Sequence, residues 1–266
     1  MAEERIDVVM ENPGDSTNDQ ANSSWSSPSS ATLHLLRKCF AELFATYFVV
    51  FSGCGSVAVN KIYGSVTFPG VCLTWGLIVM AMIYSTGHIS GAHFNPAVTL
   101  TFAIINAFQW REVIPYWVAQ FLGSVLASGT LRLILSSKTD HFFGTLPVGS
   151  DIQSLVAEFV ISFLLMFVIC GASADDRAIG QFGGLAIGST ITLNLFVAGP
   201  VSGASMNPAR SLGPALVMNE YRALWVYIVG PFAGVLAGAL VYNLIKIREP
   251  TKKEPLFDSK AGEISA

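Results

Sequence analysis

Charged side chains are scarce in this chain. Aspartate, glutamate, lysine and arginine make up 12% of the 266 residues, whereas hydrophobic residues make up 52%, and the mean hydropathy is +0.54. A soluble globular domain carries about 25% charged residues, so the composition excludes that class and indicates a protein that crosses a membrane several times. The formal net charge of −3 is small and is spread over the tails, which argues against nucleic acid as a partner.

Cysteine clusters and catalytic constellations are also lacking. The four cysteines lie in or beside apolar runs without the spacing of metal ligands, so we interpret them as small packing residues. No nucleophile, base and orienting group stand together in a pattern typical of an active site. We therefore expect no enzymatic activity, no metal and no cofactor. The cysteines are Cys39, Cys54, Cys72 and Cys170.

A signal peptide is lacking as well. The first 33 residues are polar, rich in Ser, Asn, Asp and Glu, and contain no apolar core of the kind that a signal peptide needs. Such a composition is typical of a disordered segment. We expect a disordered tail over residues 1–35, a membrane domain over 36–248 and a second tail over 249–266.

What the chain has instead is apolar segments long enough to cross a bilayer, which takes roughly 20 helical residues. Six of them lie at about 39–59, 68–86, 113–135, 154–173, 179–199 and 223–246. An even number of spans places both termini on one side. Basic residues cluster just outside the first and last spans, and the positive-inside rule makes that side the cytosol. These basic residues are Arg37, Lys38, Lys246, Arg248, Lys252 and Lys253.

One motif occurs twice, as Ser-Gly-Ala-x-x-Asn-Pro-Ala over residues 90–97 and again over 202–209. Asparagine is a favoured helix N-cap, and proline fits the first helical position because the missing N–H has no partner there. The apolar runs that follow end near residues 108 and 218, so each helix is too short to span. A half-helix inside a membrane must be buried in protein or face water, so the pair predicts a lined cavity. The residues of this candidate constriction are Asn95, Pro96, Ala97, Asn207, Pro208 and Ala209.

The two halves of the chain repeat. Ala41-Glu42 matches Ala157-Glu158 at an offset of 116, and Asn95 matches Asn207 at an offset of 112. Each repeat contains three spans and a half-helix, and because three is odd the second repeat must be inverted relative to the first. The half-helices then enter from opposite faces and meet near the middle of the membrane. The repeats cover about 39–135 and 154–246.

The positive ends of the two half-helices face each other at this meeting point. An asparagine that caps its helix with the side-chain oxygen keeps its amide NH2 free, so Asn95 and Asn207 can each donate a hydrogen bond into the cavity. A neutral solute with a lone pair is accepted there. A cation or a hydronium ion is opposed by two positive helix ends and by desolvation.

Arg210 follows in the first turn of the second half-helix. An arginine inside a membrane is costly and by default functional, and its guanidinium can donate to a passing hydroxyl while repelling cations. The alternative is a side chain that extends to the outer interface, with its charge in water.

Glu42 and Glu158 are carboxylates inside spans, at matched positions. We interpret them as structural anchors that accept hydrogen bonds from the backbone of the re-entrant loop in their own repeat, because that backbone must be satisfied somewhere. Proton coupling is the alternative. His93, just before the first half-helix, lines the cytosolic vestibule, gates the passage with pH, or hydrogen-bonds the loop backbone, and we favour the last interpretation.

These features together resemble the aquaporins, the major intrinsic protein family, over about residues 36–248. More narrowly, the stretches GHISGAHFNPA at 87–97 and AGPVSGASMN at 198–207 resemble plant nodulin-26-like intrinsic proteins. The resemblance implies an all-α membrane protein, a right-handed bundle of six transmembrane helices plus two re-entrant half-helices around an hourglass pore. It also implies a homotetramer, in the plasma membrane or another plant endomembrane.

A second constriction, on the outer side, is implied by the same resemblance. Counting from the motifs, its four positions are Trp75 (95 − 75 = 20), Leu195 (207 − 195 = 12), Ala204 (207 − 204 = 3) and Arg210. Trp75 is typical of the first, glycerol-permeable subgroup of these plant channels, whereas Leu195 replaces the usual valine. Ser211 stands where dedicated microbial glycerol facilitators carry aspartate, so we expect water to pass as well.

The chemistry of these four side chains suits an amphipathic, uncharged solute. Trp75 and Leu195 offer an apolar wall, Ala204 leaves room, and Arg210 supplies the polar side. Without the family spacing, Trp75 is equally well read as a packing or lipid-facing aromatic. We therefore predict a passive channel for water and small uncharged solutes such as glycerol, urea or undissociated metalloid acids, which excludes ions and protons.

Two other functions are considered beside this one. Inverted repeats with broken helices also build ion-coupled secondary transporters, which need a charged binding site at the midplane, where this chain offers only donors. A non-conducting structural membrane protein does not need an intact Arg210.

Overall fold

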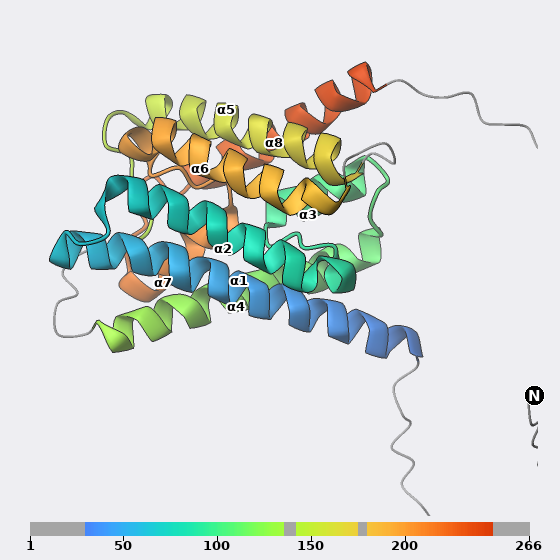
Figure 1. The fold of residues 1–266 in the computed structure, drawn as a ribbon, viewed down its shortest axis with the longest axis horizontal. Coiled ribbons are helices and arrows are strands. Elements are labelled where there is room, and N and C mark those ends of the chain that lie inside the picture. Colours follow the sequence, from blue (N-terminus) through green and yellow to red (C-terminus); the bar gives the residue numbers. More distant parts are fainter. Residues whose placement is uncertain (1–29, 136–141, 175–179, 247–266) are drawn as a thin grey trace, which may run out of the picture.

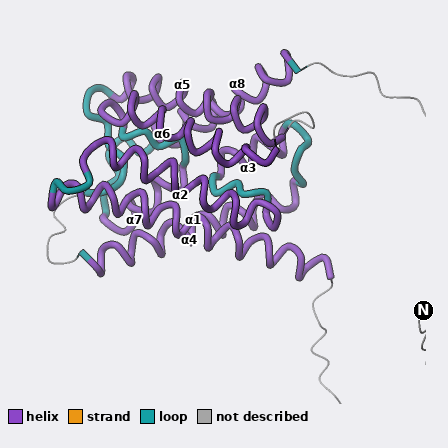
Figure 2. Tube along the Cα trace, in the orientation of Figure 1, coloured by secondary structure: helices purple, strands orange, loops and turns teal. Residues whose placement is uncertain are grey.

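The computed structural model describes residues 30–135, 142–174 and 180–246, and this part of the chain is built of helices and loops (Figures 1 and 2). Six of its helices are long and apolar enough to cross a membrane. They are α1 (Ser30–Tyr63), α2 (Thr67–Ser90), α4 (Trp110–Ile134), α5 (Asp151–Ile169, extended by a π-helical turn at Cys170–Ala174), α6 (Gly183–Ser202, preceded by a 3₁₀ turn at Gly180–Phe182) and α8 (Val226–Ile245). The all-α architecture with six spans is confirmed.

Two short helices complete the architecture, α3 (Pro96–Ile104) and α7 (Pro208–Met218). Both are too short to cross a bilayer, which takes roughly 20 residues. Helix α3 ends four residues earlier than its apolar run, because Asn106 takes a left-handed φ of 59° that no α-helix continues. Helix α7 ends at a left-handed C-cap, Asn219, with φ 55°.

The first helix begins earlier than the expected domain boundary at residue 36. Helix α1 starts at Ser30, and the sequence Ser-Ala-Thr-Leu-His-Leu between the two points contains no glycine or proline to interrupt a helix. The helix therefore continues beyond the apolar span by several turns. The expected tail segments at 1–29 and 249–266 lie outside the described residues.

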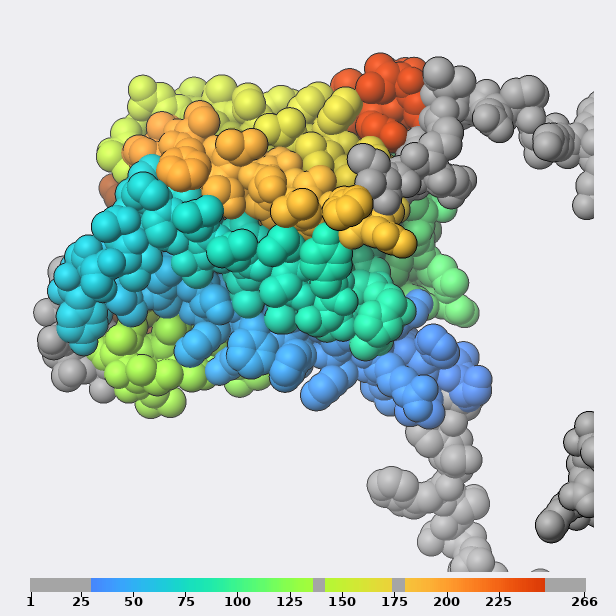
Figure 3. Space-filling model, viewed as in Figure 1, coloured from blue at the N-terminus to red at the C-terminus, as the bar shows by residue number. Residues whose placement is uncertain are grey.

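The helices pack as two groups that correspond to the repeats. Helix α1 contacts α2 and α4, and helix α5 contacts α6 and α8, while α2 and α6 join the groups along one face (Figures 1 and 3). Each half-helix crosses over: α3 packs on α8 as well as on α4, and α7 packs chiefly on α4. The half-helix of each repeat is therefore packed against a span of the other repeat.

Glycines let the paired spans approach closely. A Cβ added at Gly123 in α4 would lie 2.4 Å from the carbonyl oxygen of Leu43 in α1. The matched Gly234 in α8 stands in the same relation to the carbonyl oxygen of Phe159 in α5, also at 2.4 Å. Small residues at such crossings bring helix backbones into contact, and this contact fixes the frame in which the half-helices are held.

Candidate functional site

Both half-helices begin where the repeated motif predicts. Asn95 and Asn207 have extended backbones and cap their helices, and proline follows at the first helical position. Oδ1 of Asn95 accepts from the backbone N–H of Ala97 at 3.0 Å, and Oδ1 of Asn207 accepts from that of Ala209 at 2.9 Å. The caps satisfy backbone donors that no helical partner reaches.

The loops before the half-helices repeat the same backbone conformation. Helices α2 and α6 each end at a left-handed glycine, Gly91 with φ 87° and Gly203 with φ 81°. Two residues of each loop are left-handed without being glycine, at a cost of about 1–2 kcal/mol per residue. These are Ala92, Phe94, Ala204 and Met206, with φ between 46° and 57°.

A buried carboxylate holds the first of these loops. Oε1 of Glu42 accepts from Ser90 Oγ at 2.7 Å and from the backbone N–H of His93 at 2.9 Å. Its Oε2 accepts from the backbone N–H of Phe94 at 2.7 Å and from Gln120 Nε2 at 2.8 Å. Hydrogen bonds to a charged acceptor stabilise by about 1.5–3 kcal/mol each, which offsets the strain of the loop.

Glu158 does the same in the second repeat. Its Oε1 accepts from Ser202 Oγ at 2.6 Å and from the backbone N–H of Ser205 at 2.8 Å, and its Oε2 accepts from that of Met206 at 2.8 Å. Glu42 and Glu158 are both fully buried. These contacts are of the kind that the anchoring interpretation requires.

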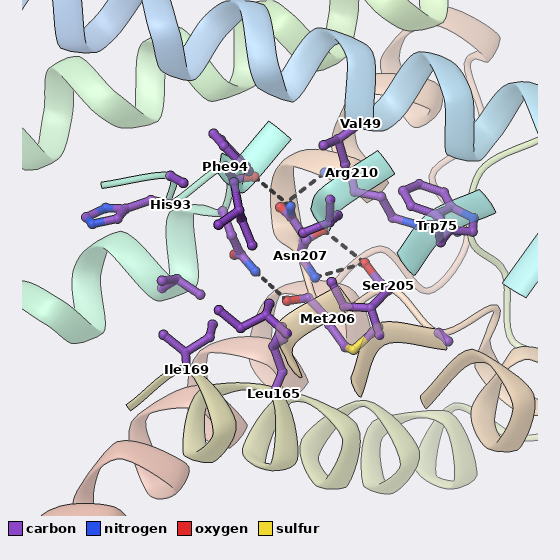
Figure 4. Close-up of a pocket in the computed structure, with 18 of the residues that line it drawn as sticks. Val49, Trp75, His93, Phe94, Leu165, Ile169, Ser205, Met206, Asn207 and Arg210 are labelled. Carbon is purple, nitrogen blue, oxygen red and sulfur yellow. Dashed lines mark hydrogen bonds between the residues drawn. The ribbon is translucent and has the colours of Figure 1, made fainter. Parts of the chain in front are cut away.

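The two capping asparagines reach across the boundary between the repeats. Nδ2 of Asn95 donates to the carbonyl of Met206 at 2.8 Å, and Nδ2 of Asn207 donates to the carbonyl of Phe94 at 2.7 Å (Figure 4). The expectation that each amide NH2 is wholly free is therefore wrong. One of its two protons satisfies a carbonyl of the opposite loop, which has no helical donor, and one remains.

A cavity runs past this crossing and receives residues from both repeats. Its lining includes the two capping asparagines and all four residues counted for the outer constriction, Trp75, Leu195, Ala204 and Arg210. A second cavity on the side of the α1–α2 and α7–α8 connections shares Trp75, Leu195 and Arg210 with the first. The three shared side chains therefore stand at the junction of the two cavities.

These three side chains and Ala204, which lines the first cavity alone, are buried, with exposures of 2–4%. Trp75 thus lies inside the bundle and not on its lipid-facing surface. Arg210 does not extend to the interface: Nη2 donates to the carbonyl of Gly203 at 3.3 Å, and Cζ lies 4.6 Å from the centroid of the Trp75 ring. The guanidinium and the indole lie side by side in Figure 4.

Three donor nitrogens at the junction lack a hydrogen-bond partner among the described residues. They are Nε and Nη1 of Arg210 and Nε1 of Trp75. A buried donor without a partner costs about 1–3 kcal/mol, so native proteins rarely retain one without a use for it. The cavity that these two side chains line also includes the apolar side chain of Leu195 in its wall.

His93 lies toward the opposite end of the first cavity from Trp75 (Figure 4). Its imidazole Nδ1 lies 3.1 Å from Oγ1 of Thr99, and the ring packs against Phe102, Phe108 and Tyr116. The expected bond from the imidazole to the loop backbone is not the one found. The loop N–H groups of residues 93 and 94 are already taken by the carboxylate of the first repeat, which leaves the threonine hydroxyl as the partner.

Two tyrosines complete the support of the loops, and sequence reasoning missed them. The hydroxyl of Tyr116 donates to the carbonyl of Ser90 at 2.8 Å, and that of Tyr227 donates to the carbonyl of Ser202 at 2.7 Å. Both tyrosines are fully buried. Their offset of 111 (227 − 116 = 111) is close to that of the motifs, so matching the two halves residue by residue was the signal that could have found them.

Six apolar spans, two half-helices of opposite repeats and a cavity between their capped ends define a polytopic membrane protein with a central passage. The chain belongs to the major intrinsic protein family, whose model matches residues 29–242. It is therefore a multi-pass membrane protein and a channel for water and small solutes.

Individual relatives give the subfamily. The chain is 59% identical over 253 residues to a probable aquaporin NIP-type of Nicotiana alata, covering 95% of this chain and 93% of that protein. It is 60% identical to aquaporin NIP1-1 of rice, Oryza sativa subsp. japonica (84% and 81% covered), and 49% identical to nodulin-26 of Glycine max (89% and 89%). These identities place it among the nodulin-26-like plant aquaporins.

A solved structure agrees in fold. The X-ray structure of the aquaglyceroporin from Plasmodium falciparum superposes with a TM-score of 0.71 at 26% identity, covering 79% of this chain and 96% of that one. The aquaporin-like fold is confirmed.

Proposed function

We propose that this channel lets glycerol and other small uncharged solutes, such as urea and undissociated metalloid acids, cross the membrane together with water, down their gradients. It excludes ions and protons. Trp75, Leu195, Ala204 and Arg210 form the selectivity filter, and Asn95 and Asn207, with the Pro-Ala that follows each, form the central constriction.

The observation that carries the proposal is the polarity of the junction between the two cavities. Three donor nitrogens without a protein partner, two on Arg210 and one on Trp75, belong to side chains that line a passage whose wall also includes the apolar Leu195 and the small Ala204. A polyol can present its hydroxyl oxygens to the donors and its carbons to the wall. Such a solute accepts hydrogen bonds from the unpaired donors as it passes, whereas an apolar solute cannot.

The central constriction supports the exclusion of cations. One amide proton of each capping asparagine is left for a passing solute, and the positive ends of α3 and α7 meet at the same place. A hydrogen-bond acceptor is stabilised there. A cation is opposed by both helix ends, by the amide donors and by the buried guanidinium of Arg210.

Proton-coupled transport is not favoured, because the two carboxylates at this depth are fully engaged. Each oxygen of Glu42 and of Glu158 accepts from at least one donor within the described residues. A carboxylate that binds and releases a proton in each transport cycle must break hydrogen bonds of this kind every time it is protonated. Their role in the proposal is that of structural loop anchors.

The remaining proposals concern the whole chain. Residues 36–248 form the channel domain between two cytosolic tails, in the plasma membrane or another plant endomembrane, and basic residues flanking the first and last spans support this orientation. The homotetramer that the resemblance implies stays a prediction.

The test is a stopped-flow swelling assay on vesicles that contain the purified chain. Glycerol and water permeabilities are expected to exceed those of empty vesicles, without uphill accumulation under a proton gradient. In Trp75→Ala the permeability to bulkier polyols is expected to rise by about tenfold or more. One methylene in an apolar pocket already changes the discrimination between two solutes by about that factor.

Trp110→Ala is the matched control, since Trp110 is 58% exposed at the start of α4 and touches neither cavity. Vesicles that stay as impermeable as empty ones would contradict the conduction of solutes. Polyol rates of Trp75→Ala equal to those of the parent would remove Trp75 from the filter.

A further inference from the structure

Gly53 lies in the second half of α1, directly against the indole of Trp75. The residue is buried, and a Cβ added to it would lie 2.4 Å from each of three indole atoms, Cδ2, Cε2 and Cε3. These atoms belong to the six-membered ring, so equal distances place the Cβ over the centre of that ring. The face of the indole therefore lies flat on the backbone of α1, with no room for a methyl group.

The indole has little freedom to retreat from such a methyl group. It is 4% exposed, and the guanidinium carbon of Arg210 lies 4.6 Å from its ring centroid. Interiors packed this closely respond to an added methylene by shifting side chains or backbone. With α1 on one side, the open direction for Trp75 is the junction between the two cavities, which it already lines.

The second repeat carries other residues at the two positions that match Gly53 and Trp75. The offset of 116 matches Gly53 to Ile169 (53 + 116 = 169), and the offset of 112 matches Trp75 to Ile187 (75 + 112 = 187). Both isoleucines line the first cavity. The first repeat thus combines the smallest residue, Gly53, with the largest, Trp75, whereas the second combines two isoleucines of intermediate size. The size of the tryptophan therefore requires a glycine at position 53.

We propose that Gly53 sets the width of the outer constriction, as a positioning residue that acts through Trp75. The inference rests on the proposed filter role of Trp75. Gly53 touches no solute itself: it provides the flat surface that keeps the indole back from the passage. A side chain of any size at position 53 pushes the indole into the passage. The narrower passage lowers the permeability to glycerol more than the permeability to water.

The experiment compares glycerol and water permeabilities of the full chain in vesicles. We expect Gly53→Ala to lower the glycerol-to-water ratio by about tenfold, the lower end of what one methylene changes in an apolar pocket. Gly55→Ala is the matched control on the same helix, because its Cβ would meet only the end of a flexible side chain, Leu131 Cδ2 at 3.2 Å. The control is expected to keep the parent ratio.

A double variant separates positioning from a general effect on the fold. Trp75→Phe alone is expected to raise the ratio, and Gly53→Ala combined with Trp75→Phe is expected to restore at least the parent ratio, because the smaller ring leaves space for the methyl group. A merely structural role predicts that the double variant stays as impaired as Gly53→Ala. An unchanged ratio in Gly53→Ala, or equal losses for water and glycerol, overturns the inference.

The filter role of Trp75 and the positioning role of Gly53 are tested by different outcomes. If Trp75→Phe leaves the ratio unchanged, the filter role of Trp75 is wrong, whereas a response to Trp75→Phe without one to Gly53→Ala overturns only the inference on Gly53. If Gly53→Ala yields no folded protein, recovery of folded, glycerol-permeable protein on adding Trp75→Phe supports the contact. Continued failure of the double variant to fold overturns it.

Discussion

At Arg210 the protein buries a permanent positive charge that forms no salt bridge with a carboxylate of the described residues. Among the described residues the ion pair found joins Lys38 to Glu112, far from this side chain in the sequence. The guanidinium is held instead by the carbonyl of Gly203 and by the indole of Trp75, contacts that orient the charge without neutralising it. The uncompensated charge therefore supports the proposed exclusion of cations where the two cavities join.

We expect Arg210→Val to raise the leak of protons and cations while water flux persists. The loss of about 1.4 kcal/mol of barrier already raises a rate tenfold, so an increase of about tenfold or more is expected. Proton flux is measured with a pH-sensitive dye inside vesicles, beside urea flux in the same preparation.

Arg111→Val serves as the control for that variant, since Arg111 is exposed near the start of α4 and lines neither cavity. Proton and urea fluxes of Arg210→Val that match those of the parent would refute the filter role of the arginine.

Among the elements, the two loops at 91–95 and 203–207 decide the geometry of the passage. They combine strained left-handed residues with carbonyls that no helix satisfies. They keep their shape because a carboxylate and the opposite asparagine bind each loop, and a tyrosine binds the carbonyl of the helical residue just before it. Strain of this kind persists only where the surroundings over-determine the conformation.

We expect Glu158→Gln to destabilise the protein by about 2 kcal/mol or more, because the amide nitrogen cannot accept and leaves a backbone N–H such as that of Met206 without a partner. The thermal unfolding midpoint of the purified chain in detergent measures the change. Glu220→Gln is the control, since Glu220 is only partly buried and lies between α7 and α8. A midpoint equal to that of the parent would contradict the anchoring role.

Element bounds show what local sequence can and cannot supply. The starts of α3 and α7 follow from Asn-Pro, because a cap and a proline act within one turn. The end of α3 at Ile104 does not follow from hydropathy, since the run stays apolar to residue 108 and only the left-handed Asn106 stops the helix. Tyr116 and Tyr227 were missed for a related reason: their partners lie 26 and 25 residues away.

On the scale of the whole molecule, neither repeat is complete alone. Helix α3 of the first repeat packs on α8 of the second, and α7 of the second packs on α4 of the first. Helix α1 begins and helix α8 ends at the same end of the bundle in Figure 1, as an even number of spans requires.

We expect epitope tags at both termini to be accessible only after the plasma membrane is permeabilised, because the basic residues beside the first and last spans stay in the cytosol. A tag inserted at Gly64, in the exposed turn between α1 and α2, is expected to bind antibody on intact cells. Immunofluorescence with and without detergent measures both. Terminal tags that bind antibody on intact cells would reverse the orientation.

The sequence by itself determined the six spans, the starts of both half-helices, the inverted repeat and the family, because hydropathy, caps and internal matches are local or additive properties of the chain. Only the tertiary structure decided that one amide proton of each asparagine is used across the repeats, that Arg210 and Trp75 keep unpaired donors, and that Gly53 lies against the indole. Those facts depend on distances between segments that are far apart in the chain, and such distances are set by how the helices pack and not by any pattern within one of them.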